Sequence, residues 1–302
     1  KHYIMKKSLF IALFLICITL FSQEKYKASD YSLPNNVKTY NTFVYRYDID
    51  LGKYFVVEKH IRIFEKGLLT YDYVLENYLD RVSQLKKFEY NAKNQLVSIK
   101  EAEDFNDALY PYQEFYYENG RLIKAEEISG NKRIFTDYSY DSSGKITKTK
   151  TYQDDKVVLK EAEYKYTSPS DHTIYTKGFR DGKVVSEMRE KYQKNLLIEK
   201  FINNSLGEHT YEFKYDEKNN RILLVDGSDN FDTSYFYGKT GAILKSKKTE
   251  YDDFVFDLVN YFEFSEITYQ DGTKDGSRTF DKDYAKLFNM SVLSYDFVDD
   301  LK

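Results

Sequence analysis

The chain has 302 residues, with 45 basic and 49 acidic side chains and a formal net charge of −4. It contains 31 tyrosines and 22 phenylalanines but one cysteine, three prolines and no tryptophan. A single cysteine excludes a disulfide framework and a zinc site built from several thiolates. The acidic balance argues against a nucleic acid partner, because neutralisation of phosphates dominates that affinity. The length suits one large all-β domain or two ordinary domains.

The first 22 residues have the features of a signal peptide. Lys6 and Lys7 precede an apolar run from Leu9 to Phe21, and Ser22 is a small residue at the expected cleavage point. The run is shorter than the roughly 20 residues that a membrane-spanning helix needs. We therefore expect residues 1–22 to be removed and no transmembrane anchor to remain. The exported chain is then periplasmic, extracellular or at the cell surface.

Cys17, the only cysteine, lies inside this apolar run. A lipid-attachment site needs small residues before the cysteine, whereas Leu15 and Ile16 precede Cys17, so we favour the signal-peptide interpretation. The chain left after cleavage has 42 basic and 49 acidic residues, a net charge of −7. It has no cysteine, so packing alone must stabilise it.

The next residues lead into the folded region. Residues 23–36 are polar, and we expect a tether or an irregular lead-in to a single β-repeat domain over residues 37–302. Period-2 alternation predicts strands at residues 42–47 and 54–64, with a turn at Gly52. Between residues 68 and 87, four aliphatic residues fit a helical face while neighbouring tyrosines fit strands. We favour strands there by analogy with the sequence that follows.

From Phe88 onward a short pattern recurs. Two aromatic residues two positions apart precede a polar turn, and an aliphatic residue opens the return strand; the clearest copy is Tyr138–Ile146, YSYDSSGKI. Turn glycines such as Gly144 supply the positive φ of tight hairpins. A spacing of 22 to 27 residues between anchor tyrosines is typical of a repeat array. The anchors are Tyr90, Tyr117, Tyr140, Tyr166, Tyr192, Tyr215 and Tyr237.

One hairpin is only marginally stable in water, so neighbouring hairpins must pair strand to strand. We predict an all-β fold: a long twisted antiparallel sheet of tandem β-hairpin repeats, clearest over residues 88–245. Further strands are expected at 254–264 and 267–269. Over residues 281–302 we expect a short C-terminal helical cap that protects the last repeat from edge pairing. Its apolar face would hold Tyr284, Leu287, Phe288 and Val292.

The segment Tyr138–Ile146 resembles the YD repeat of RHS-type bacterial surface proteins, and similar segments span roughly residues 88–245. The resemblance implies a sheet built from hairpins. Large RHS proteins have many more repeats, which form a closed shell around a toxin, and a protease core motif. This chain has too few repeats for such a shell and lacks that motif. The resemblance therefore implies an architecture and not a toxin function.

Residues that could carry catalysis are scattered. His60, His172 and His209 lie far apart in the sequence, so we predict no metal site. No serine lies in a nucleophile elbow, and the glycines occur singly in turns rather than in a phosphate-binding loop. No pair of carboxylates can be singled out for acid–base work. We therefore predict no catalytic residue, no cofactor and no enzymatic activity.

Our first functional hypothesis is an exported, non-enzymatic binding or scaffold protein of the cell envelope, with a glycan or an envelope protein as partner. Rows of tyrosines would offer a platform to sugar rings or to an extended strand, although the rings could equally pack on each other. Two alternatives stay open: a carbohydrate-active enzyme with a dispersed carboxylate site, and a periplasmic lipid or lipoprotein carrier with a concave apolar face. The candidate ligand-binding residues are Tyr117, Tyr140, Tyr166 and Tyr215.

Overall fold

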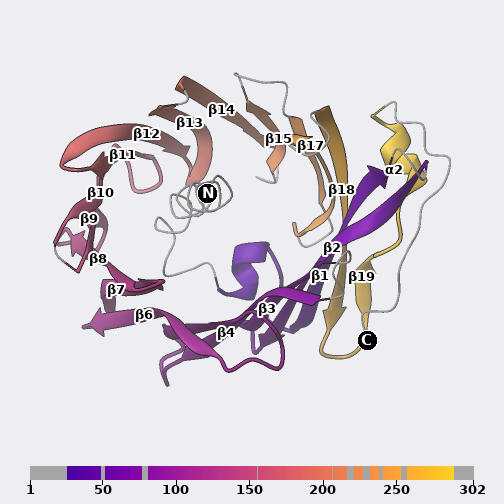
Figure 1. Cartoon of the computed structure of the whole chain (residues 1–302), viewed down its shortest axis with the longest axis horizontal. Coiled ribbons are helices and arrows are strands. Elements are labelled where there is room, and N and C mark those ends of the chain that lie inside the picture. Colours follow the sequence, from indigo (N-terminus) through magenta and orange to yellow (C-terminus); the bar gives the residue numbers. More distant parts are fainter. Residues whose placement is uncertain are drawn as a thin grey trace.

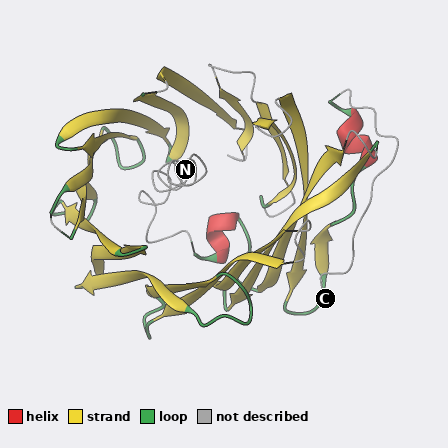
Figure 2. Cartoon of the chain, in the orientation of Figure 1, coloured by secondary structure: helices red, strands yellow, loops and turns green. Residues whose placement is uncertain are grey.

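The computed structural model describes residues 26–48, 52–76, 81–154, 156–205, 207–215, 221–226, 232–237, 241–252 and 257–288. These residues form antiparallel strands with two short helices, η1 (Ala28–Tyr31) and α2 (Lys282–Lys286) (Figure 2). The strands are β1 (Val37–Asp48), β2 (Lys53–Glu65), β3 (Leu68–Glu76), β4 (Arg81–Tyr90), β5 (Leu96–Ala102), β6 (Tyr110–Glu118), β7 (Arg121–Ser129), β8 (Lys132–Tyr140), β9 (Ile146–Gln153), β10 (Val158–Tyr166), β11 (His172–Arg180), β12 (Lys183–Gln193), β13 (Leu196–Asn204), β14 (Gly207–Tyr215), β15 (Arg221–Asp226), β16 (Asp232–Tyr237), β17 (Ile243–Asp252), β18 (Asp257–Tyr269) and β19 (Lys274–Gly276).

From β1 to β18 each strand pairs with the next one in the chain, and β19 adds to β18. β18 also pairs with β1, where Phe43 lies opposite Phe264, so the series of strands returns on itself as a ring (Figure 1). We call this β1–β18 junction the seam. The predicted antiparallel sheet of hairpins is confirmed. So is the strand interpretation of residues 68–87, which hold β3 and most of β4; residues 77–80 lie outside the described residues.

Alternate side chains of each strand point into the ring or away from it. The helix η1 lies inside the ring (Figure 1), and the residues that pack with it therefore define the inner wall. Phe88, Ile99 and Phe115 belong to that set and are buried. Helix α2 lies on the other side of the sheet, so its contacts define the outer wall.

The lead-in from residue 26 to residue 36 packs on the inner wall. The backbone N–H of Ala28 donates to the carbonyl of Gly67 at 2.8 Å, and that of Leu69 donates to Tyr26 at 2.9 Å. The Tyr26 ring lies 4.9 Å from that of Phe88, and Ala28 is fully buried. The segment therefore fills the inside of the ring along its first strands, which its polar composition did not indicate.

Charged residues also face inward beneath this segment. Arg62, Asp72, Lys86 and Glu101 lie opposite one another on β2 to β5, with alternating sign; we call them the inner charge ladder. The Arg62 Nε atom lies 3.5 Å from an Asp72 oxygen, and Lys86 Nζ lies 3.1 Å from a Glu101 oxygen. Tyr31 stacks its ring 5.3 Å from the Arg62 guanidinium. Each charge is thus neutralised by a neighbour, which burial requires.

The C-terminal segment covers the seam from outside. Asp281 caps α2 by accepting hydrogen bonds from the backbone N–H groups of Asp283 and Tyr284, at 2.9 and 3.0 Å. Tyr284 and Phe288 pack on aromatic residues of the seam, as expected. The expected place of Leu287 on this face is wrong, because the helix ends at Lys286 and Leu287 is 74% exposed.

Val292, the fourth residue of that expected face, lies outside the described residues, as does the rest of segment 289–302. The short C-terminal helix itself is confirmed. It covers the outer side of the sheet at the seam, where β18 already has β1 as a partner.

The outer wall of the middle strands is charged. Six residues on consecutive strands lie directly opposite one another with alternating sign, which favours each cross-strand pair. They are Lys124, Asp137, Lys150, Glu161, Lys177 and Glu187. Neither of the two described helices has the length and hydrophobicity that crossing a membrane demands.

Candidate functional site

The anchor tyrosines of the repeat stand at the ends of strands on the inner wall. The hydroxyl of Tyr117 donates to the carbonyl of Leu96, 21 residues earlier in the chain, at 2.9 Å. We call this contact a tyrosine–carbonyl bond, and in each case the acceptor is the carbonyl of an aliphatic residue that is first or second in its strand. The same bond joins Tyr40 to Ile243, Tyr90 to Leu69, Tyr140 to Leu122 and Tyr215 to Leu197, at 2.7 to 2.8 Å.

The aspartate of the YD pattern has its own role in the turn. Asp141 accepts the backbone N–H of Lys145 at 2.9 Å, and Gly144 holds φ +88°. Asn91 makes the corresponding bond to Gln95 at 3.0 Å. A side-chain acceptor of this kind closes the turn and fixes the register of the following strand. Tyrosine and aspartate thus explain the repeat structurally: one ties hairpins together, and the other shapes the turn.

The four tyrosines predicted to bind a ligand all belong to this inner set or lie beside it. Tyr117, Tyr140 and Tyr215 use their hydroxyls in tyrosine–carbonyl bonds, and burial raises the pKa of Tyr117 to about 12. Tyr166 lies 5.2 Å from the His172 ring, with Lys145 Nζ 4.5 Å above its own ring. The structure therefore gives three of them a packing role, and a role in ligand binding stays a prediction.

A cavity of about 150 Å³ opens where β6, β7 and β8 meet. Pro111, Tyr112 and Gln113 from the irregular pairing of β5 with β6 form one side. The other side is formed by outward-facing residues, among them Glu114, Glu126, Ile128 and Arg133. β-Bulges of this kind re-aim side chains and occur beside functional sites.

Two glutamates lie side by side at this cavity. Glu114 on β6 lies opposite Glu126 on β7, and the Tyr116 hydroxyl donates to Glu114 at 2.7 Å and lies 3.2 Å from a Glu126 oxygen. The Arg133 guanidinium donates to Glu126 at 2.9 Å. The hydrogen bond to Glu114 raises the pKa of the Tyr116 hydroxyl above its ordinary value, and partial burial adds to this.

This set of groups can bind and orient a hydroxylated molecule. Carboxylates accept hydrogen bonds from ligand hydroxyls, the guanidinium donates to ligand oxygens, and an aromatic face covers apolar parts of a sugar ring. Acid–base hydrolysis of a glycoside also uses a pair of carboxylates. Sequence reasoning missed this pair. Within the described residues, no three His, Cys, Asp or Glu side chains gather closely enough to hold a metal ion.

Comparison with known proteins places the chain in no family. No family model matches it, and no curated protein matches its sequence. Among solved structures, a porin-like protein from Bacteroides uniformis is similar over 78% of this chain and 99% of its own, with a TM-score of 0.43 and 9% identity. The TcdB2-TccC3-Cdc42 structure is similar over 72% of this chain and 15% of its own, with a TM-score of 0.35 and 10% identity.

The Tc holotoxin pore of Photorhabdus luminescens matches over the same shares, with a TM-score of 0.33 and 11% identity. In both toxin structures the match therefore spans a small part of the other chain. No family model supports the resemblance to YD repeats, which rests on the repeated tyrosine and turn. We base no functional conclusion on these likenesses.

Proposed function

We propose that this protein is an exported, non-enzymatic binding protein of the cell envelope and that its outer-wall cavity binds carbohydrate. The observation that carries the proposal is the Tyr116 hydroxyl held between Glu114 and Glu126 beside Arg133. The N-terminal signal-peptide pattern supports export. The ring of hairpins supplies a stiff wall on which these side chains keep their positions, as a preformed site needs.

The charges at the cavity favour hydroxyl groups over an anionic ligand. Two carboxylates face one guanidinium, so the local balance is negative and would repel a phosphate or carboxylate. Carboxylate oxygens each accept more than one hydrogen bond, so a neutral sugar can donate to Glu114 or Glu126 and accept from Arg133. The exposed ring of Tyr116, at 40% exposure, remains available to the apolar face of a sugar.

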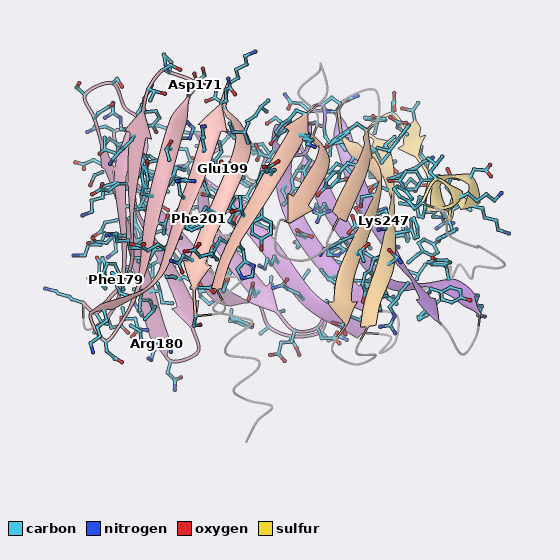
Figure 3. The ribbon with its side chains drawn as sticks, turned by 90° about the horizontal axis from the view of Figure 1, so that it is seen from above. Asp171, Phe179, Arg180, Glu199, Phe201 and Lys247 are labelled. Carbon is cyan, nitrogen blue, oxygen red and sulfur yellow. The ribbon has the colours of Figure 1, made fainter. Side chains whose placement is uncertain are left out.

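The test is binding of the purified protein to a broad glycan array, with matched variants. Arg133→Gln and Glu126→Gln each remove one charged hydrogen-bonding group, so we expect binding at least about tenfold weaker in both. Arg189→Gln is the control, because Arg189 also lies on the outer wall and binds a glutamate, Glu199, at 2.7 Å (Figure 3 labels Glu199). Binding should survive in that variant. A blank array, or equal binding by Arg133→Gln, would refute the proposal.

The glutamate pair also favours a second function, a carbohydrate-active enzyme. In that case Glu114 and Glu126 would divide the roles of acid and base, or acid and nucleophile. The array then yields the substrate to test: each bound glycan is incubated with the protein, and new reducing ends are measured. Turnover that is lost in Glu114→Gln, with binding retained, would establish the enzyme. Unchanged glycan leaves the binding function.

A lipid carrier has less support. Such a protein needs a continuous apolar concave face. Among the described residues the inner wall instead carries the inner charge ladder and rows of threonines, including the buried pair Thr136 and Thr151 joined at 3.0 Å. These groups interrupt any apolar lining.

A further inference from the structure

Tyr192 departs from the pattern of the four anchor tyrosines that make tyrosine–carbonyl bonds, which are Tyr90, Tyr117, Tyr140 and Tyr215. Tyr192 ends β12 as Tyr117 ends β6, yet its hydroxyl is buried and makes no hydrogen bond. The residue that opens the preceding return strand here is His172 instead of a leucine or isoleucine. The two rings lie directly across from each other in register and stack face to face, 4.4 Å apart with an interplanar angle of 5°.

His172 leaves a second group unused beside the first. Its Nδ1 atom is buried and without a hydrogen-bond partner, while Tyr192 is 7% exposed. Buried polar groups nearly always have partners, and a place where a repeated structural rule fails is a candidate for function. Here a donor and an acceptor lie together on the inner wall, flanked by the ring of Tyr166.

The pair lies near one rim of the ring. Figure 3 shows Asp171 at one rim and Arg180 at the other, at the two ends of β11. The neighbouring turns are fixed to each other: Asn195 N–H donates to Ser170 at 2.7 Å, and Lys194 N–H donates to the Asp171 carboxylate at 2.7 Å. The position of His172 is therefore set before any ligand arrives, which lowers the entropy cost of binding.

The charges around the pair select against ions of either sign. Burial lowers the pKa of His172 and Lys145 acts in the same direction, against an opposing effect of Asp171, so the neutral imidazole is favoured. Glu190, on the same face as Tyr192, disfavours an anion at the tyrosine hydroxyl. A hydroxyl group, which both donates and accepts, complements a neutral imidazole nitrogen and a phenol at once.

We propose that His172 and Tyr192 form a binding site on the inner wall for an uncharged, hydroxyl-bearing ligand, a sugar or another polyol. This site is separate from the outer-wall cavity and does not depend on it. Of the four tyrosines that the sequence predicted, Tyr166 is the one beside it, and its ring would face the ligand together with that of His172.

The experiment measures the melting temperature of the purified protein with and without a panel of neutral mono- and disaccharides. Inorganic phosphate and acetate serve as the charged probes. We expect at least one neutral sugar to raise the melting temperature. Tyr192→Phe and His172→Phe keep the stacked rings and remove only the polar atoms. When either is combined with Arg133→Gln, which weakens the outer-wall cavity, the rise should disappear and the Kd should weaken at least about tenfold.

Two further variants separate this site from others. Tyr215→Phe loses a tyrosine–carbonyl bond, so it should melt at a lower temperature yet keep the sugar-dependent rise. Arg133→Gln, in the outer-wall cavity, should also keep it, so failure of one site is distinguishable from failure of the other.

Three results would overturn the proposal: a rise that survives when Tyr192→Phe is combined with Arg133→Gln, a rise with phosphate instead of sugar, or no rise with any sugar. In the last case Tyr192→Phe should stabilise the protein, as expected when a buried hydroxyl has water as its sole partner or none.

Discussion

The inner wall of the ring is built in two ways. Along β1 to β7 the lead-in segment packs against it, and buried residues such as Phe88 and Ile99 form one large cluster with that segment. Along β10 to β13 the described residues form a small cluster, with Ala162, Ile174 and Tyr192 as its buried members. The hairpin repeat is the same in both regions. What differs, among the described residues, is the size of the apolar cluster that packs on the wall.

Matched isoleucines test this comparison with the largest expected effect. Ile99 and Ile174 both face inward and are 2% and 3% exposed. Ile99→Ala removes contacts within the large cluster and should cost about 4 kcal/mol of unfolding free energy, whereas Ile174→Ala should cost about 2 kcal/mol because its surroundings can collapse. Urea denaturation of both variants gives the two values. Equal losses would show that the covering segment adds no stability to the wall.

The inner charge ladder provides the next test. Arg62→Met leaves the partly buried Asp72 carboxylate without its cation, and we expect a loss of about 2 kcal/mol. The double variant Arg62→Met, Asp72→Asn removes the stranded charge and should recover part of that loss. Chemical denaturation at neutral pH measures both. A double variant less stable than the single one would mean that Asp72 has other partners of equal weight.

Tyrosine–carbonyl bonds occur both where the lead-in segment covers the inner wall and beyond it. Removing one such bond should therefore cost the same unfolding free energy in either place. Tyr117→Phe and Tyr215→Phe remove one hydroxyl from each region, and each should lower the unfolding free energy by about 1 kcal/mol. Thermal denaturation followed by circular dichroism compares them. A loss confined to Tyr117→Phe would indicate that the bond matters only where the lead-in segment covers the wall.

The smallest expected effect is a dependence of the unfolding free energy on pH that arises from His172, on the inner wall along β10 to β13. Burial and Lys145 lower the pKa of His172, while Asp171 acts in the opposite direction and the adjacent rings of Tyr166 and Tyr192 are uncharged. The unfolded chain therefore binds the proton first as the pH falls below about 6.5, and the folded state loses stability from that pH downward. Above it the group contributes nothing.

Denaturation midpoints at about pH 7.5 and about pH 5.5 measure this effect. His172→Phe should show a smaller difference between the two midpoints than the unchanged protein. Tyr166→Phe, which keeps the ring beside the imidazole, is the control and should leave the difference unchanged. An equal difference in all three proteins would assign the pH dependence to other groups.

The local architecture could be predicted from the sequence because each hairpin carries its own signals. Aromatic alternation marks the strands, and Asp141 with Gly144 marks a turn whose geometry follows from those two residues. The packing of residues 26–36 on the inner wall could not be predicted from the sequence. Its buried residues Ala28 and Leu33 are isolated apolar residues among polar ones and form no periodic pattern. Ring closure has no local signal, since it depends on the twist accumulated over all the strands.

The glutamate pair was missed for a more specific reason. A regular hairpin about Asn119 and Gly120 would place Glu114 opposite Ala125, on the evidence of spacing alone. The structure has a register shift between Tyr116 and Tyr117, which places Glu114 opposite Glu126 instead. A single inserted residue thus decides which side chains meet, and period-2 alternation does not reveal it.

The seam has a consequence for how the protein acquires its structure. Thr42 and Ser265 share a buried hydrogen bond across it although 223 residues separate them. Hairpins can form one after another along the chain, but β1 has no partner on its seam side until β18 arrives. During that interval two unpaired strand edges are exposed, one at β1 and one at the growing end. Folding therefore passes through an open intermediate that is prone to pair with other chains, and closure of the ring ends that risk.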